Sequence, residues 1–203
     1  FLYNMKKIEY LNTLLELTKL PLELCEKIVF YIHTYTFKTR DELKDAIQKY
    51  TSNINKSIYG DCKWWDVSRI TDMNNMFYNY DFNNDISHWD VSNVINMSHM
   101  FYYSHINIDI SNWDVSNVIN MSHMFYNGYI IIDISNWDVS SVTNMNSMFK
   151  NCYFNNNISN WDVSSVTNMH SMFKTIYFNP DISKWNINSV INKQSMFYNC
   201  NSI

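Results

Sequence analysis

The sequence predicts an α/β repeat solenoid, in which each coil carries one short parallel strand and one short helical turn, behind an α-helical N-terminal cap. Three observations support this fold class. Residues recur at a fixed period of 24, the recurring apolar positions alternate or follow helical spacing, and residues 1–62 lack the repeat. Repeats with periods between 20 and 50 residues stack, because one unit alone cannot bury its apolar face. We therefore expect a cap over residues 1–62 and about six repeats over residues 63–203.

Tryptophan sets the period, which runs without insertion or deletion from Trp65 to Trp185. Methionine and phenylalanine follow the same period, and the mid-array positions predicted to form the core are Trp89, Trp113, Trp137, Trp161, Met100, Phe101, Met124 and Phe125. Within a repeat, Asn-Met-x-x-Met-Phe has the spacing of one face of a short helical turn. The alternation in Phe-Asn-x-Asp-Ile-Ser indicates a short strand, and stacked copies predict a parallel sheet along one side.

Two polar columns recur with the same period, Asp66, Asp90, Asp114, Asp138 and Asp162 in one and Asn96, Asn120, Asn144 and Asn168 in the other. Stacked carboxylates repel unless backbone N–H groups or hydroxyls bind them. We expect each Asp to cap its own Asp-Val-Ser turn, and the Asn column to satisfy loop backbone between coils. A calcium-binding column is the alternative, although carboxylates from separate coils lack the oxygen cage that calcium prefers. His99 and His123 share one offset with no third ligand, which predicts an exposed pair.

The N-terminal segment predicts three helices. They cover residues 5–20, residues 22–35 and a stretch from Thr39 to about Tyr50 that opens with a capping box including Glu42. The simplest interpretation is a cap over the first coil. The second helix also resembles the opening of an F-box through Leu20, Pro21, Leu22, Leu24 and Ile28. That resemblance implies a Skp1-like adaptor as partner and a substrate-receptor role in a cullin ubiquitin ligase.

Charge and motifs exclude several classes of function. Residues 64–203 hold five Lys/Arg against eleven Asp/Glu, whereas a surface for nucleic acid would be basic. No apolar run approaches the ~18–20 residues of a membrane span. There is no nucleophile–base constellation, phosphate loop or zinc signature, so we expect neither catalysis nor a cofactor. A non-enzymatic interaction or structural module is the leading hypothesis.

The loops that follow the repeated phenylalanine vary most and are rich in tyrosine, at Tyr78, Tyr102, Tyr103, Tyr126, Tyr129, Tyr153 and Tyr177. Tyrosine is favoured at interfaces, so these residues are the predicted interaction surface. The alternative is that they only flank the core. A second expectation concerns the last coil, which stops at Ile203 without a cap. Unpaired strand edge there predicts a homo-oligomer or another protein partner.

The repeat Trp-Asp-Val-Ser-x-Val-Thr-Asn-Met-x-x-Met-Phe, followed by Phe-Asn-x-Asp-Ile-Ser, resembles the BspA-type leucine-rich-repeat surface-protein family. Its members are bacterial and mycoplasma surface lipoproteins and giant-virus proteins. The resemblance covers residues 65–203 and implies a right-handed, leucine-rich-repeat-like coil with an adhesive or protein-binding role. The asparagine-rich composition suits a giant virus. We expect an intracellular or virion-associated protein, or a cell-surface protein if a signal precedes Phe1.

Overall fold

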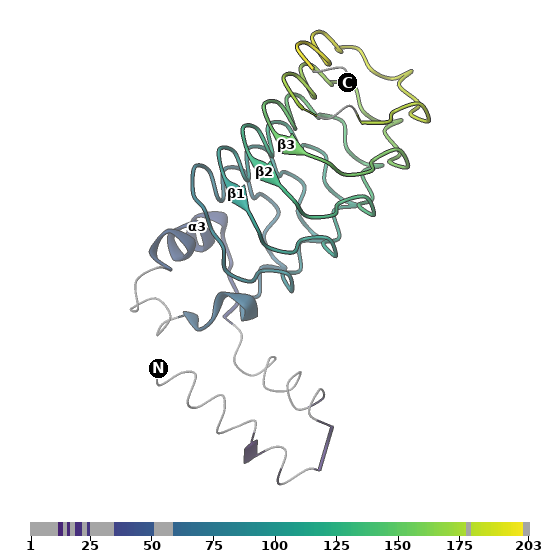
Figure 1. Cartoon of the computed structure of the whole chain (residues 1–203). Coiled ribbons are helices and arrows are strands. Elements are labelled where there is room, and N and C mark those ends of the chain that lie inside the picture. Colours follow the sequence, from purple (N-terminus) through teal and green to yellow (C-terminus); the bar gives the residue numbers. More distant parts are fainter. Residues whose placement is uncertain are drawn as a thin grey trace.

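The computed structural model describes residues 12–13, 16, 19–21, 24, 35–50, 59–177 and 180–200. Its elements are helix α3 (Arg40–Lys49), the 3₁₀ helix η1 (Cys62–Trp64) and the strands β1 (His105–Ile106), β2 (Tyr129–Ile130) and β3 (Tyr153–Phe154). In Figure 1, α3 lies at one end of a row of similar coils that runs toward the C-terminus. The helices predicted over residues 5–20 and 22–35 fall almost wholly outside the described residues.

The helix predicted after Thr39 is confirmed as α3. Thr39 is its N-cap and accepts a hydrogen bond from the Glu42 N–H at 3.2 Å, while the Glu42 carboxylate accepts one from the Lys38 N–H at 3.0 Å. The first bond satisfies a backbone donor that the first turn of a helix leaves free, and the second ties the residue before the N-cap to that turn. The apolar face of the helix, including Leu43 and Ile47, is fully buried in the common core.

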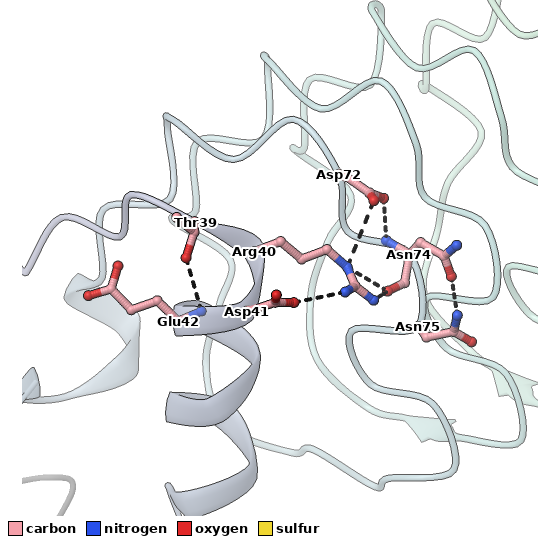
Figure 2. Close-up of polar contacts among 7 residues, drawn as sticks. All are labelled: Thr39, Arg40, Asp41, Glu42, Asp72, Asn74 and Asn75. Atoms are coloured by element: carbon pink, nitrogen blue, oxygen red, sulfur yellow. Dashed lines mark hydrogen bonds and ion pairs between the residues drawn. The ribbon is translucent and has the colours of Figure 1, made fainter.

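Arg40 fastens the start of α3 to the first coil of the array. Its guanidinium donates from Nε to the Asn74 carbonyl at 3.2 Å and lies 3.8 Å from the Asp72 carboxylate, as Figure 2 shows. Rings close the apolar end of the same coil, because Phe37 and Tyr50 lie 4.9 and 5.3 Å from the Trp65 ring. Residues that flank α3 on both sides thus cover the first tryptophan. Whether the boundary between cap and array falls at residue 62 stays a prediction.

Backbone hydrogen bonds join successive coils in register. Met97, His99, Phe101 and Tyr103 donate their N–H groups to the carbonyls of Asn120, Ser122, Met124 and Tyr126, each 23 positions further on. Parallel bridges also link the Asn column, pairing Asn96 with Asn120 and continuing to Asn192. Because the offset is the same at each step, equivalent side chains of neighbouring coils lie above one another.

The Asn-Met-x-x-Met-Phe segment forms β-turns, where the sequence pattern predicts a helical turn. The Met100 N–H bonds the Met97 carbonyl, the Ser104 N–H bonds the Phe101 carbonyl, and His99 and Tyr103 have φ angles of 55° and 57°. Positive φ at the third residue is typical of type II turns. The same two positions are left-handed in every coil, at Asn75, His99, His123, Ser147, Ser171 and Ser195, and at Asn79, Tyr103, Asn127, Asn151, Thr175 and Asn199. The N–H groups of every second residue then donate hydrogen bonds to carbonyls of the next coil. These bonds take the place of the hydrogen bonds within a helix.

Strands β1, β2 and β3 form a parallel sheet in that order, with His105 opposite Tyr129 and Ile106 opposite Ile130. Each strand has two residues, so it covers only the start of the stretch whose alternation predicts a strand. A turn ends the extended stretch soon afterwards, because the Asp109 carboxylate accepts the Ser111 N–H at 2.9 Å. In each strand the first side chain is exposed and the second is buried.

Tryptophan and phenylalanine fill the centre of the array. Each indole N–H from Trp113 to Trp185 donates to an isoleucine carbonyl 27 residues earlier, as from Trp137 to Ile110 at 3.1 Å. Phenylalanine rings stack from coil to coil, with Phe101 and Phe125 5.8 Å apart and nearly parallel. All eight mid-array residues expected in the core are buried.

Candidate functional site

One surface column holds tyrosines followed by lysines at a single repeat position. We call it the tyrosine–lysine column; its members are Tyr78, Tyr102, Tyr126, Lys150, Lys174 and Tyr198. The ring of Tyr102 lies 5.0 Å from that of Tyr78 and 4.6 Å from that of Tyr126, with the planes within 9° of parallel. Lys150 Nζ lies 5.1 Å from the Tyr126 ring centroid, and Lys174 Nζ lies 4.8 Å from that of Tyr198.

The position of this column follows from the turn chemistry. Each member comes directly after the repeated phenylalanine, which is buried in every coil but the last, and its N–H bonds the carbonyl of the left-handed residue three positions earlier, as from Tyr102 to His99. The phenylalanine points into the core, so its neighbour points outward. The constant register then sets these outward-pointing rings face to face, which is a favourable arrangement when the rings are offset.

A histidine pair and a further tyrosine lie against this column. The rings of His99 and His123 stack at 4.6 Å and lie 5.4 and 5.8 Å from those of Tyr102 and Tyr126. The ring centroid of Tyr103 lies 4.8 Å from that of Tyr102. The histidines are half-buried, so the expectation of an exposed pair is wrong. The stacked neighbours cover them.

Burial shapes the electrostatics of this cluster. Loss of solvent lowers the pKa of His99, and the same cause, with the nearby charges of His99 and Lys150, lowers the pKa of His123 to about 4. Both imidazoles are therefore neutral near pH 7. Burial, followed by the neighbouring phenols, raises the pKa of Tyr102, which keeps its hydroxyl protonated as donor and acceptor.

A second tyrosine column stands on the sheet. Tyr129 of β2 and Tyr153 of β3 stack at 4.7 Å, and Tyr177 occupies the same position one coil further on. Their exposed fractions are 41%, 50% and 67%. The seven tyrosines predicted from the sequence thus divide into three in the tyrosine–lysine column, three in this second column, and Tyr103 beside the first. We call them together the tyrosine surface.

Stacking decides what the tyrosine surface can bind. Since the rings within each stack cover one another's faces, their edges and hydroxyl groups are what a partner meets. The tyrosine surface offers few open aromatic faces on which a flat ligand could stack. The surface is suited to hydrogen bonding and edge contacts along the array.

The aspartate and asparagine columns are occupied by bonds within their own turns. In the Asp column, each carboxylate accepts the N–H of the Ser two residues on at 3.0–3.1 Å. Bonds from the Ser116 hydroxyl and N–H hold the pKa of Asp114 below its usual value. Each Asn side chain likewise accepts the N–H two residues on in the same coil at 3.0–3.1 Å. The Asn side chains therefore satisfy loop backbone as expected, but within their own coil, and the Asn main chain makes the bridges between coils.

Other sites considered from the sequence find less support. Among the described residues, no group of three or more His, Cys, Asp or Glu side chains could hold a metal ion, and no helix is long and apolar enough to cross a membrane. Of the F-box-like residues, Leu20 is partly buried and Pro21 and Leu24 are exposed. Leu22 and Ile28 lie outside the described part of the chain. The F-box-like interpretation, the Skp1-like adaptor and the homo-oligomer through the last coil remain predictions.

These features define a protein of stacked 24-residue units that carries an ordered aromatic surface. Residues 41–131 and 129–203 match a family described as a Mycoplasma protein of unknown function, DUF285. The two matches together cover most of the chain, which belongs to this family. They begin inside α3, so this helix falls within the matched region together with the repeats. No curated protein and no solved structure matches the chain.

Proposed function

We propose that the chain is a non-enzymatic protein-binding module, a leucine-rich-repeat-like solenoid whose tyrosine surface contacts a protein partner. The fold part of the proposal is supported by the constant 23-residue offset of the bonds that the turn N–H groups donate to the next coil. The functional part rests on one observation: tyrosines from variable loop positions of different coils gather into ordered columns with their edges exposed.

The alternative, that these tyrosines only flank the core, accounts for less. Tyr78, Tyr103, Tyr129, Tyr153 and Tyr177 are 41–67% exposed. The recorded ring contacts of Tyr129 and Tyr153 are with each other. Rings held by stacking lose little further freedom when a partner binds, which lowers the entropic cost of an interface.

The proposal agrees with the adhesive or protein-binding role that the BspA-type resemblance implies. It needs no cofactor, because polar edges and a few cations are enough to recognise a protein surface. We extend it to a surface-exposed or virion-associated setting, in which a repeated, rigid face would contact host or structural proteins.

Affinity capture with paired variants tests the proposal. One bait carries Tyr103→Ser, Tyr129→Ser and Tyr153→Ser, and the control bait carries Ile95→Ser and Ile119→Ser, which remove side chains that are 46% exposed at another repeat position. We expect the wild type and the control to capture the same protein from the native source and the tyrosine variant to lose it. Equal capture by all three baits, each shown to be folded by circular dichroism, would contradict the proposal.

A further inference from the structure

We propose that the tyrosine–lysine column binds a second copy of this chain, with the two arrays side by side and running in opposite directions. This inference rests on the proposed function, since it names the partner of the same surface. Two features of the column support it: the order of its residues and the spacing of its rings.

The order of the residues favours a reversed copy. From the first coil onward the column reads Tyr, Tyr, Tyr, Lys, Lys, Tyr. If a second copy lies opposite in reverse order, Tyr126 faces Lys150 of the second copy, Tyr102 faces Lys174, and Tyr78 faces Tyr198. Each lysine then meets the edge of a tyrosine, where the hydroxyl oxygen can accept a hydrogen bond from the ammonium group. A copy running in the same direction would set lysine against lysine, and like charges oppose association.

The spacing of the rings favours a partner with the same repeat. Neighbouring tyrosines in the column lie 4.6–5.0 Å apart. An extended peptide presents side chains on one face about every 6.6 Å, so its side chains would no longer lie opposite the rings after a few coils. A second array has the same spacing because it is the same chain, so it can make a contact at each coil.

The surroundings of the column are compatible with this pairing. His99 and His123, which lie against the tyrosines, have lowered pKa values and add no opposing charge near pH 7. A hollow between α3 and the first coil, lined among others by Lys44, Gln48 and Tyr78, adjoins the start of the column. The reversed copy would bring Tyr198, which is 63% exposed, to this hollow and its lysine.

The symmetry of the pairing limits the assembly to a dimer. Its two-fold axis passes between the levels of Tyr126 and Lys150, so both copies use the same patch and the contact closes on itself. Lys150 Nζ, already 5.1 Å from the ring of its own Tyr126, would lie near the second copy's Tyr126 as well. We therefore expect dimers and no filaments through this face.

Sedimentation equilibrium of the full chain tests the interaction. We expect a concentration-dependent dimer for the wild type. Replacing Lys150 and Lys174 by Met should raise the dimer dissociation constant about 30-fold or more, because four hydrogen bonds from lysine to tyrosine hydroxyls, worth at least about 0.5 kcal/mol each, are lost. The control Lys184→Met with Lys193→Met makes the same change at other repeat positions and should leave the dimer intact. A wild type that stays monomeric, or equal effects of the two variants, would overturn the inference.

Cysteine cross-linking tests the direction. In a background with Cys25 and Cys200 replaced by Ser, Tyr78→Cys and Tyr198→Cys variants, which alter opposite ends of the column, are treated with a short bis-maleimide, alone and mixed. Opposite directions predict that the mixture cross-links far more than either variant alone. Parallel arrays predict the reverse, which would overturn the pairing. If the chain is monomeric yet the serine variant of the tyrosine surface loses another captured protein, only the self-pairing fails and the proposed function stands.

Discussion

Replacing Trp137 by Phe tests how the coils hold one another. Trp137 is 3% exposed, and its indole N–H donates to the Ile110 carbonyl of the preceding coil at 3.1 Å. Phenylalanine keeps an aromatic ring but removes the donor and part of the ring volume. The Ile110 carbonyl still accepts a hydrogen bond from the backbone N–H of Trp113 at 3.2 Å, so it is not left without a partner.

The expected cost follows from these two losses. A hydrogen bond whose acceptor keeps another donor is worth about 1 kcal/mol. The void left by the smaller ring adds roughly 1–2 kcal/mol, at the low end for large-to-small core changes. We expect Trp137→Phe to lower the free energy of unfolding by about 2–3 kcal/mol, which corresponds to a Tm lower by roughly 4–12 °C for a chain of this size.

Urea unfolding followed by tyrosine and tryptophan fluorescence and by circular dichroism measures this cost. Tyr153→Phe is the matched control, since it removes a polar group from a ring that is half exposed, and it should change stability by no more than about 0.5 kcal/mol. If the free energy of unfolding of Trp137→Phe lies within about 0.5 kcal/mol of the wild-type value, the indole hydrogen bond and the packing of the larger ring do not hold the coils together.

Three further predictions concern single positions. Asp162→Ala should destabilise the chain by about 1 kcal/mol in urea unfolding, as loss of a helix cap does, because Asp162 accepts the Ser164 N–H at 3.0 Å; an unchanged midpoint would contradict its turn-capping role. Burial lowers the pKa of His123 to about 4, below its unfolded value of ~6.5, so its contribution to stability is present above pH 6.5 and is lost as the pH falls toward 4. His123→Asn should therefore lose less stability than the wild type between pH 7 and 4, and parallel pH curves would exclude this assignment. Gly128→Ala should cost roughly 1–3 kcal/mol, because a Cβ there would lie 3.0 Å from the Ser104 carbonyl oxygen and 3.1 Å from that of Phe125; an unchanged Tm would show that the two turns yield freely.

The recurring apolar residues predict much of the fold because their burial depends only on period and polarity. Trp137 and Phe125 repeat at fixed intervals and fill the core. The helix α3 follows from a local signal, Thr39 with Glu42, which acts within one turn of chain. In both cases the physical cause lies in neighbouring residues or in a strict repeat, so the sequence contains it.

The turns were harder to predict because bonds between coils decide them. The spacing of Met97, Met100 and Phe101 also fits one face of a helix. The choice of left-handed φ at His99 and Tyr103 becomes favourable only when the next coil supplies carbonyl acceptors for alternate N–H groups. A local pattern cannot contain that information.

The tyrosine surface was predictable in its members but not in its arrangement. Their variable positions and residue type mark Tyr102 and Tyr129 as candidate interface residues. That Tyr102 stacks between Tyr78 and Tyr126, with Lys150 over the last ring, depends on the side-chain rotamers and on the register between coils. The covering of His99 and His123 by the same stack has the same origin.

Site-specific photo-cross-linking in living cells tests most directly whether the tyrosine surface is where this protein binds. A benzophenone amino acid is introduced at Tyr103 or Tyr129 and, for comparison, at Ile95 or Ile119, all of which are 41–46% exposed. We expect a discrete protein adduct from the tyrosine positions, either a second copy of the chain or another protein, and none from the isoleucine positions. Adducts confined to Ile95 and Ile119, or no adduct at any of the four positions, would contradict the account.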